Sequence, residues 1–294
     1  MIAVPPNPIL KQLGLAEFDR ALILHADDVG MCEATLSAFA ELTPLGVSGS
    51  VMVPSPWFPA VADYHRNTKN SDLGLHLTLT SEWSHYRWRP ISGGVDQASL
   101  LDEHGYLPRS MAELWAKAVP DAIFREVTAQ IDQAARAGIS PTHFDDHMAA
   151  LQRPDLLWRY VDLVSACHLP FRQARPNVAQ PGESDWQRQT RAALIEAEAR
   201  GLPLFDRIVG LPLDEADATT KIAFIRHFLS ELPPGTVSLL FGHPASDTPE
   251  LRQIAPDWHG RVADLTTLAD PQIYRFMRQS GIHLLRFDKL PRPL

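Results

Sequence analysis

Cysteine is scarce in this sequence, with only Cys32 and Cys167 among 294 residues. Two isolated thiols provide neither a disulfide framework nor the spacing of a cysteine metal site, so we expect both to be reduced. Runs of about 18 uncharged apolar residues are also missing, which predicts no membrane span. Residues 1–15 lack the charged start and apolar run of a secretory signal peptide, and the sequence therefore favours a cytoplasmic location.

The sequence has no excess of basic residues, and its formal net charge is −8. Lys and Arg are scattered, whereas a surface that follows phosphates needs them clustered, so nucleic acid is disfavoured as a partner and a neutral sugar is compatible. Neither a Gly/Ser-rich linker nor an internal repeat divides the chain. We expect one domain over residues 1–294, with residues 1–20 as an N-terminal extension.

Short apolar runs alternate with amphipathic stretches of helical length, a pattern typical of parallel strands joined by helices. The predicted strands are 21–25, 47–53, 73–79, 142–148, 169–174, 203–209, 237–241 and 282–287. The predicted helices are 33–42, 57–65, 121–137, 155–166, 186–200, 219–232 and, after a long connection, 271–279. Eight strands interleaved with helices indicate an α/β fold, a single TIM-like (β/α) barrel in which a distortion or an incomplete strand is allowed.

Residues 80–108 break this alternation. The segment is rich in Gly, Pro and Ser and carries Trp83, Tyr86, Trp88 and Tyr106. We predict a long loop, and such loops in compact domains are often functional.

Asp27 and Asp28 directly follow the first predicted strand. Two adjacent carboxylates are costly to bury unless a cation neutralises them, and a metal ion would do so. The alternative is an exposed strand end where Asp28 caps the next helix.

Histidines occupy the ends of three other predicted strands. His76 lies within an apolar run, either as a ligand or as a hydrogen-bonded core residue. Strand alternation places His143, Asp145 and His147 on one face, which suits a metal ligand whose tautomer a carboxylate holds, or else a solvated strand end. His243 stands between Gly242 and Pro244, where it faces a site or forms an ordinary turn. The C-terminal strand ends are where a barrel gathers its active groups, so together these residues predict one site.

Three ordered motifs resemble the YdjC-like family of carbohydrate deacetylases. They are Ala-Asp-Asp-Val-Gly at 26–30, Gly-Leu-His-Leu-Thr at 74–78 and Thr-His-Phe-Asp-Asp-His at 142–147, and the later Gly-His-Pro at 242–244 resembles the family's His-Pro element. The resemblance extends over residues 22–287. The third motif departs from many relatives in continuing as Met148-Ala149-Ala150 without further histidines and in having Asp146 before its last histidine.

The resemblance implies a metal-dependent hydrolase that removes an acetyl group from an N-acetylated sugar. Asp28, His76 and His147 would bind one divalent ion, with zinc or magnesium expected. Asp27 would be the general base and His243, when protonated, the acid for the leaving amine.

Further residues are candidates for substrate contact or for supporting roles. Arg172 could orient Asp27 or His243 or hold a sugar hydroxyl, Arg175 has the same options, and Asp145 could hold a ligand's tautomer. The two arginines can equally be surface residues. Trp88, with Trp83 and Tyr86, could stack on a sugar ring, fix its own loop or form a homodimer contact.

Two other functions remain open from the sequence. One is a metal-dependent hydrolase of a different amide or of an ester, because the metal chemistry does not depend on what carries the acyl group. The other is a non-catalytic sugar-binding protein with a bound ion.

Overall fold

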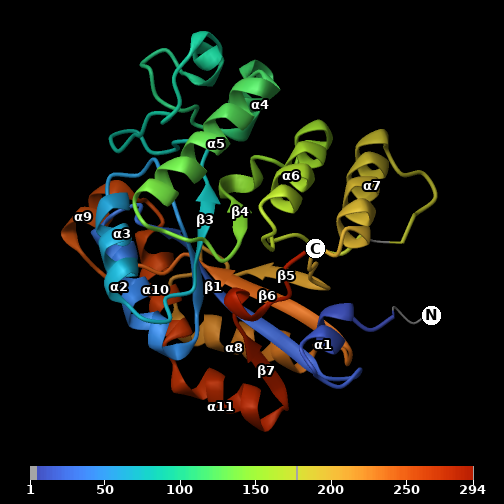
Figure 1. Ribbon diagram of the computed structural model, residues 1–294. Helices are drawn as coiled ribbons and strands as arrows, with labels where there is room; N and C mark the ends of the chain where they lie inside the picture. Colours follow the sequence, from blue (N-terminus) through green and yellow to red (C-terminus); the bar gives the residue numbers. More distant parts are fainter. Residues whose placement is uncertain (1–4, 177, 294) are drawn as a thin grey trace.

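The computed structural model describes residues 5–176 and 178–293, which form an α/β domain built around one parallel sheet (Figure 1). Its strands are β1 (Arg20–Val29), β2 (Ser48–Val51), β3 (Leu73–Leu77), β4 (Phe144–Asp146), β5 (Arg207–Gly210), β6 (Thr236–Gly242) and β7 (Ile282–Leu285). They are hydrogen-bonded in the order β4-β3-β2-β1-β6-β5. β7 pairs with the first half of β1, and β2 pairs with its second half.

The sheet curves into a distorted, incompletely hydrogen-bonded barrel. Isolated parallel bridges join Phe144 to Phe171 and Ala174 to Phe205, and so continue the ladder from β4 towards β5. The predicted α/β barrel is therefore confirmed, but the prediction of a full strand over 169–174 was wrong. Pro170 has no N–H to donate, and the N–H of Gln173 turns back to the carbonyl of Phe171, so the ladder is interrupted there.

Helices surround the strands in Figure 1. The α-helices are α1 (Pro8–Gln12), α2 (Glu33–Leu42), α3 (Phe58–Asn67), α4 (Met111–Lys117), α5 (Pro120–Arg136), α6 (Pro154–Ala166), α7 (Asp185–Ala199), α8 (Ala218–Ser230), α9 (Pro249–Ile254), α10 (Trp258–Leu268) and α11 (Pro271–Gln279). Short 3₁₀ helices are η1 (Thr43–Leu45), η2 (Val95–Leu100), η3 (His147–Ala149) and η4 (Phe287–Lys289). No helix among the described residues is both long and apolar enough to cross a membrane.

The sequence patterns explain most helix boundaries. α5 starts at Pro120, buries Ile123, Val127 and Ala134 along one face, and ends before Gly138, whose φ of 82° suits a glycine. The predicted loop over 80–108 is confirmed apart from η2. The prediction that the segment after β6 is a long connection without helices was wrong, because it contains α9 and α10. α9 begins at Pro249, and the side chain of Thr248 caps its N-terminus.

The inside of the barrel changes from apolar to polar along the strands. Near the N-terminal ends, Ala21 and Ile23 of β1 pack with Phe205 and Phe287, and Leu10 of α1 joins the same cluster. Strand alternation continues this inward row of β1 from Ile23 to His25 and Asp27, all three buried. The polar end of the barrel therefore rests on a packed apolar layer.

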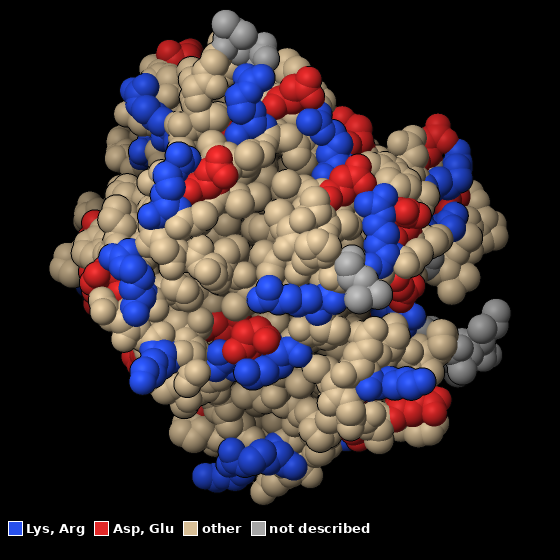
Figure 2. All heavy atoms as spheres, in the orientation of Figure 1, with Lys and Arg blue, Asp and Glu red and all other residues tan. Residues whose placement is uncertain are grey.

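Acidic and basic side chains are interspersed over the face drawn in Figure 2. Many form exposed pairs, such as Arg159 with Asp121 and Arg200 with Asp162. Such pairs contribute at most about 1 kcal/mol each, so the buried layer decides stability more than they do.

Phe287 provides a test of the apolar layer. Replacing Phe287, which is 1% exposed and contacts His143 and Phe205, with Ala should lower the free energy of unfolding by about 3–5 kcal/mol because a cavity remains. Phe18→Ala, at a residue 71% exposed, is the matched control and should change it by about 0.5 kcal/mol or less. Urea unfolding measures both, and similar small losses for the two variants would contradict this view of the core.

Candidate metal and catalytic site

A β-bulge lets two consecutive carboxylates reach the same cavity. The register between β1 and β2 shifts between Ala26 and Val29, and Asp28 has a φ of 60°, a left-handed conformation that is unusual for a residue other than glycine. In a regular strand, consecutive side chains would point to opposite faces. Here both Asp27 and Asp28 line the cavity at the C-terminal ends of the strands.

Three of the predicted site residues bring donor atoms together. Oδ1 of Asp28 lies 3.3 Å from Nε2 of His76 and 3.2 Å from Nδ1 of His147, and these two nitrogens are 3.2 Å apart. Tetrahedral ligands about 2.0–2.1 Å from a zinc ion would be roughly 3.3 Å apart, so the spacing fits one ion. Asp28 Oδ1 is buried without a hydrogen-bond partner, which also suits a ligand atom.

Carboxylates outside this triad orient its two imidazoles. Nδ1 of His76 lies 2.8 Å from Oδ1 of Asp145, and Nε2 of His147 lies 3.0 Å from Oε1 of Glu82. Because an ionised carboxylate only accepts hydrogen bonds, each ring carries its proton on that outer nitrogen and keeps the inner lone pair free. Asp145, a candidate for such a supporting role from the sequence, contacts His76, whereas Glu82 was not predicted because it lies in the irregular 80–108 segment, where no periodic pattern marks it.

The carboxylates also make the centre of the site favourable for a cation. Burial alone would lower the pKa of both imidazoles, but Asp145 and Asp28 raise the pKa of His76 well above its ordinary value. Against the same effect of burial, Glu82 and Asp28 raise the pKa of His147 to about 9. A positive charge between the three donor atoms would satisfy the same attraction.

Arginines neutralise the outer oxygens of the Asp pair. Nη1 of Arg261, on α10, donates to Oδ2 of Asp28 at 2.8 Å, and Nη1 of Arg172 donates to Oδ1 of Asp27 at 2.6 Å. Burial raises the pKa of each carboxyl, but Arg172 with His25 and His76 at Asp27, and Arg261 with His147 and His76 at Asp28, together hold both pKa values well below their ordinary range. Arg261 was not predicted, because α10 lies in the segment expected to be a plain connection.

His243 faces the remaining oxygen of Asp27. Its Nε2 is 4.0 Å from Asp27 Oδ2, and its Nδ1 is buried without a hydrogen-bond partner. The backbone N–H of His243 donates to Oδ2 of Asp264, which also forms a buried ion pair with Lys221. Burial lowers the pKa of His243, with Asp28 and Asp27 opposing in part.

The site opens into a cavity of about 620 Å³. Besides the residues above, its wall includes Trp83, Met148, Gln152, Ile208, Leu213, Phe241, Pro256 and Asp257. Trp88, a candidate for sugar contact, is not on this wall: it is 3% exposed, and its Nε1 donates to the carbonyl of Thr80. Tyr86 donates to the carbonyl of Met31, so both rings anchor the loop and leave Trp83 as the tryptophan at the cavity. Arg175 pairs with Glu198 and Asp206 and is absent from the wall.

Glu82 provides a test of the metal site. Glu82→Gln should weaken binding of the divalent ion about 10- to 100-fold, since the amide no longer offers a charged acceptor to His147. Glu103→Gln, in the same loop and with a side chain 85% exposed, is the matched control. Calorimetric titration with Zn²⁺ and Mg²⁺ measures both, and equal affinities for the wild type and Glu82→Gln would refute the supporting role.

This chain is similar in sequence to a known protein family and to several carbohydrate deacetylases. The family described as YdjC-like protein matches residues 21–279. The carbohydrate deacetylase of Thermus thermophilus is 38% identical over 276 residues, which cover 92% of this chain and 94% of that protein. The carbohydrate deacetylase of Geobacillus stearothermophilus is 26% identical, and the match covers 91% of this chain and 97% of that protein.

A solved structure has the same fold. It is a protein of Enterococcus faecalis V583 described as a cellobiose-phosphate cleavage protein, with a TM-score of 0.75 at 22% sequence identity. The match covers 92% of this chain and 98% of the other.

Proposed function

We propose that this chain, which belongs to the YdjC-like family, is a metal-dependent carbohydrate deacetylase that hydrolyses the acetyl group of an N-acetylated sugar. The observation that carries the proposal is the convergence of Asp28, His76 and His147 beside the free oxygen of Asp27. The names of the related carbohydrate deacetylases support the substrate class.

Asp28, His76 and His147 would hold one divalent ion, zinc or magnesium. When bound, such an ion lowers the pKa of water and polarises the acyl carbonyl. Asp145, Glu82 and Arg261 keep these ligands in position through the hydrogen bonds described above.

Asp27 acts as the general base. Its Oδ1 is already engaged by protein donors, whereas its Oδ2 lies 4.0 Å from Nε2 of His76 and faces the point where the three ligand atoms converge. Arg172 keeps the carboxylate ionised, so Oδ2 can take a proton from the attacking water.

His243 acts as the general acid. Its Nε2 is directed towards Asp27 Oδ2, and in its protonated form it donates to the nitrogen of the departing amine. Because burial lowers its pKa, the protonated ring is a stronger acid than an exposed imidazolium. Asp27 thus accepts the proton of the water, and His243 supplies the proton of the departing amine.

The cavity suits a sugar substituent. Trp83 and Phe241 provide flat apolar surface, and Gln152 and Asp257 provide polar groups at the wall. Trp83 also lies against the guanidinium of Arg261, 5.7 Å from the ring centroid, which fixes the indole beside the ligand site.

Substitution of the two catalytic groups tests the mechanism. Asp27→Asn and His243→Ala should each lower kcat about 10²- to 10⁴-fold, because each removes one proton transfer. Both variants should still bind one metal ion per chain. Asp63→Asn and His104→Ala, at side chains 68% and 65% exposed, are the matched controls. Acetate release from N-acetylglucosamine oligomers measures the rates, and undiminished turnover in either site variant would refute its role.

The choice of substrate separates the proposed function from its alternatives. The metal-loaded protein should release acetate from N-acetylglucosamine oligomers faster than from an aryl acetate ester. Faster turnover of the ester, or of another amide, would instead indicate a different acyl hydrolase. Binding of the oligomers without turnover, unchanged by Asp27→Asn, would indicate a sugar-binding protein.

A further inference from the structure

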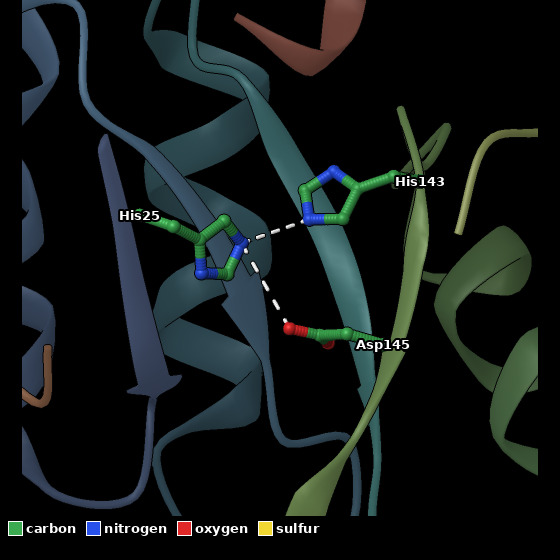
Figure 3. Close-up of side chains that lie close together, drawn as sticks. All are labelled: His25, His143 and Asp145. Carbon is green, nitrogen blue, oxygen red and sulfur yellow. Dashed lines mark hydrogen bonds and ion pairs between the residues drawn. The ribbon is translucent and has the colours of Figure 1, made fainter. Parts of the chain in front are cut away.

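Two buried imidazoles lie beneath the site, and neither has been given a role of its own in the mechanism above. His25 on β1 and His143 just before β4 are both 0% exposed. Figure 3 shows their rings meeting through their edges between β1 and β4, with Nε2 of one 2.9 Å from Nε2 of the other. Asp145 lies beside them, with Oδ2 3.9 Å from Nε2 of His25.

When both rings are neutral, the hydrogen bonds of this pair have one consistent arrangement of protons. Ionised Asp27 only accepts, so Nδ1 of His25, 2.8 Å from Asp27 Oδ1, carries a hydrogen. In a neutral ring, Nε2 of His25 is then an acceptor, and Nε2 of His143 donates to it. Nδ1 of His143 in turn accepts from the hydroxyl of Thr142 at 3.0 Å.

This arrangement argues against a second ion at His25, His143 and Asp145, although their donor atoms lie close enough to be a candidate set. In this arrangement the two Nε2 atoms bond to each other and Nδ1 of His143 accepts from Thr142, so an ion there would have to displace the hydrogen bond between the rings. Burial and the neighbouring His25 also hold the pKa of His143 well below its ordinary value, in agreement with a neutral ring.

Packing fixes the orientation of both rings. His143 stacks on Phe287 with centroids 3.6 Å apart, and Phe287 meets His25 edge-on at 5.7 Å. Gly74 leaves the space that the His143 ring occupies, since a Cβ there would lie 2.6 Å from it. A chain of hydrogen bonds held this firmly can fix the group at its end.

That group is the carboxylate of Asp27. We propose that His25, held by His143, is a positioning residue that, together with Arg172, engages Oδ1 of Asp27 and so leaves Oδ2 to act as the base. The inference rests on the proposed deacetylase function. It predicts that catalysis depends on a hydrogen-bond donor at the position of Nδ1 of His25. The contact with His143 serves to hold the His25 ring in place.

Asparagine and glutamine at position 25 separate these two contacts. An Asn amide reaches the position of Nδ1 and keeps a donor to Asp27, whereas a Gln amide reaches the position of Nε2 and keeps only the contact with His143. We expect His25→Gln to lower kcat about 10- to 100-fold with KM and metal content unchanged, and His25→Asn to recover most of that loss. His104→Gln is the exposed control.

The pH profile provides a readout that a purely structural role would not move. The charged and titratable groups around Asp27 are Arg172, Asp145, His76, His243 and His25. Removing the His25 donor takes away a hydrogen bond to the ionised form, which raises the pKa of Asp27. The limb of the kcat profile that reports the base should therefore shift to higher pH in His25→Gln and shift less in His25→Asn.

The tautomers can be read without any assay of activity. Nitrogen-15 NMR of labelled histidines should show His25 protonated on Nδ1 and His143 on Nε2. The opposite tautomer at His25, equal kcat in the wild type and His25→Gln, or equal losses in both variants with an unshifted profile would each overturn the inference. If the wild type releases no acetate from any acetylated sugar, the proposed function itself fails, and the tautomers then show whether the hydrogen-bond chain exists.

Discussion

The burial of two adjacent carboxylates is the constraint on which the rest of the structure depends. Asp27 and Asp28 are 3% and 1% exposed, and isolated ionised carboxylates in such surroundings would be prohibitively unfavourable. Each is therefore paired with an arginine, Arg172 or Arg261. Even so, Oδ1 of Asp28 has no hydrogen-bond partner, and the imbalance favours a further cation at that point.

Neutralising this pair requires the fold to be nearly complete. Arg172 comes after α6, and Arg261 is 233 residues away from Asp28 along the chain, on the helix that precedes α11. Asp264, also on α10, accepts from the backbone N–H of His243 and is itself paired with Lys221 on α8. Removing one member of such a buried network leaves the others uncompensated, so stability and the geometry of the site are coupled.

The sequence could indicate the candidate ligands but not all of their supports. Asp28, His76, His147 and His243 come at strand ends, where period-two alternation stops and polar residues appear, and the parallel sheet brings such ends together. The β-bulge that turns Asp28 towards Asp27 leaves no mark in the sequence, because it is a matter of register between neighbouring strands. Glu82 and Arg261 come from a loop and from an unpredicted helix, and their roles depend on tertiary contacts alone. Trp88 shows the converse, since its aromatic character did not reveal that its indole N–H is used within the loop.

Three carboxylates of the site, those of Asp27, Asp28 and Glu82, divide their two oxygens in the same way. Asp27 gives Oδ1 to His25 and Arg172 and keeps Oδ2 free, and Asp28 gives Oδ2 to Arg261 and keeps Oδ1 free. Glu82 likewise gives Oε1 to His147, while its Oε2 has no hydrogen-bond partner. Because one oxygen of each carboxylate is held by protein donors, the carboxylate cannot rotate to bring its other oxygen to a donor within the protein. The lone pairs of that other oxygen therefore stay directed at the cavity. Such preorganisation is established when the chain folds, so groups that act on a ligand are already in position before the ligand arrives.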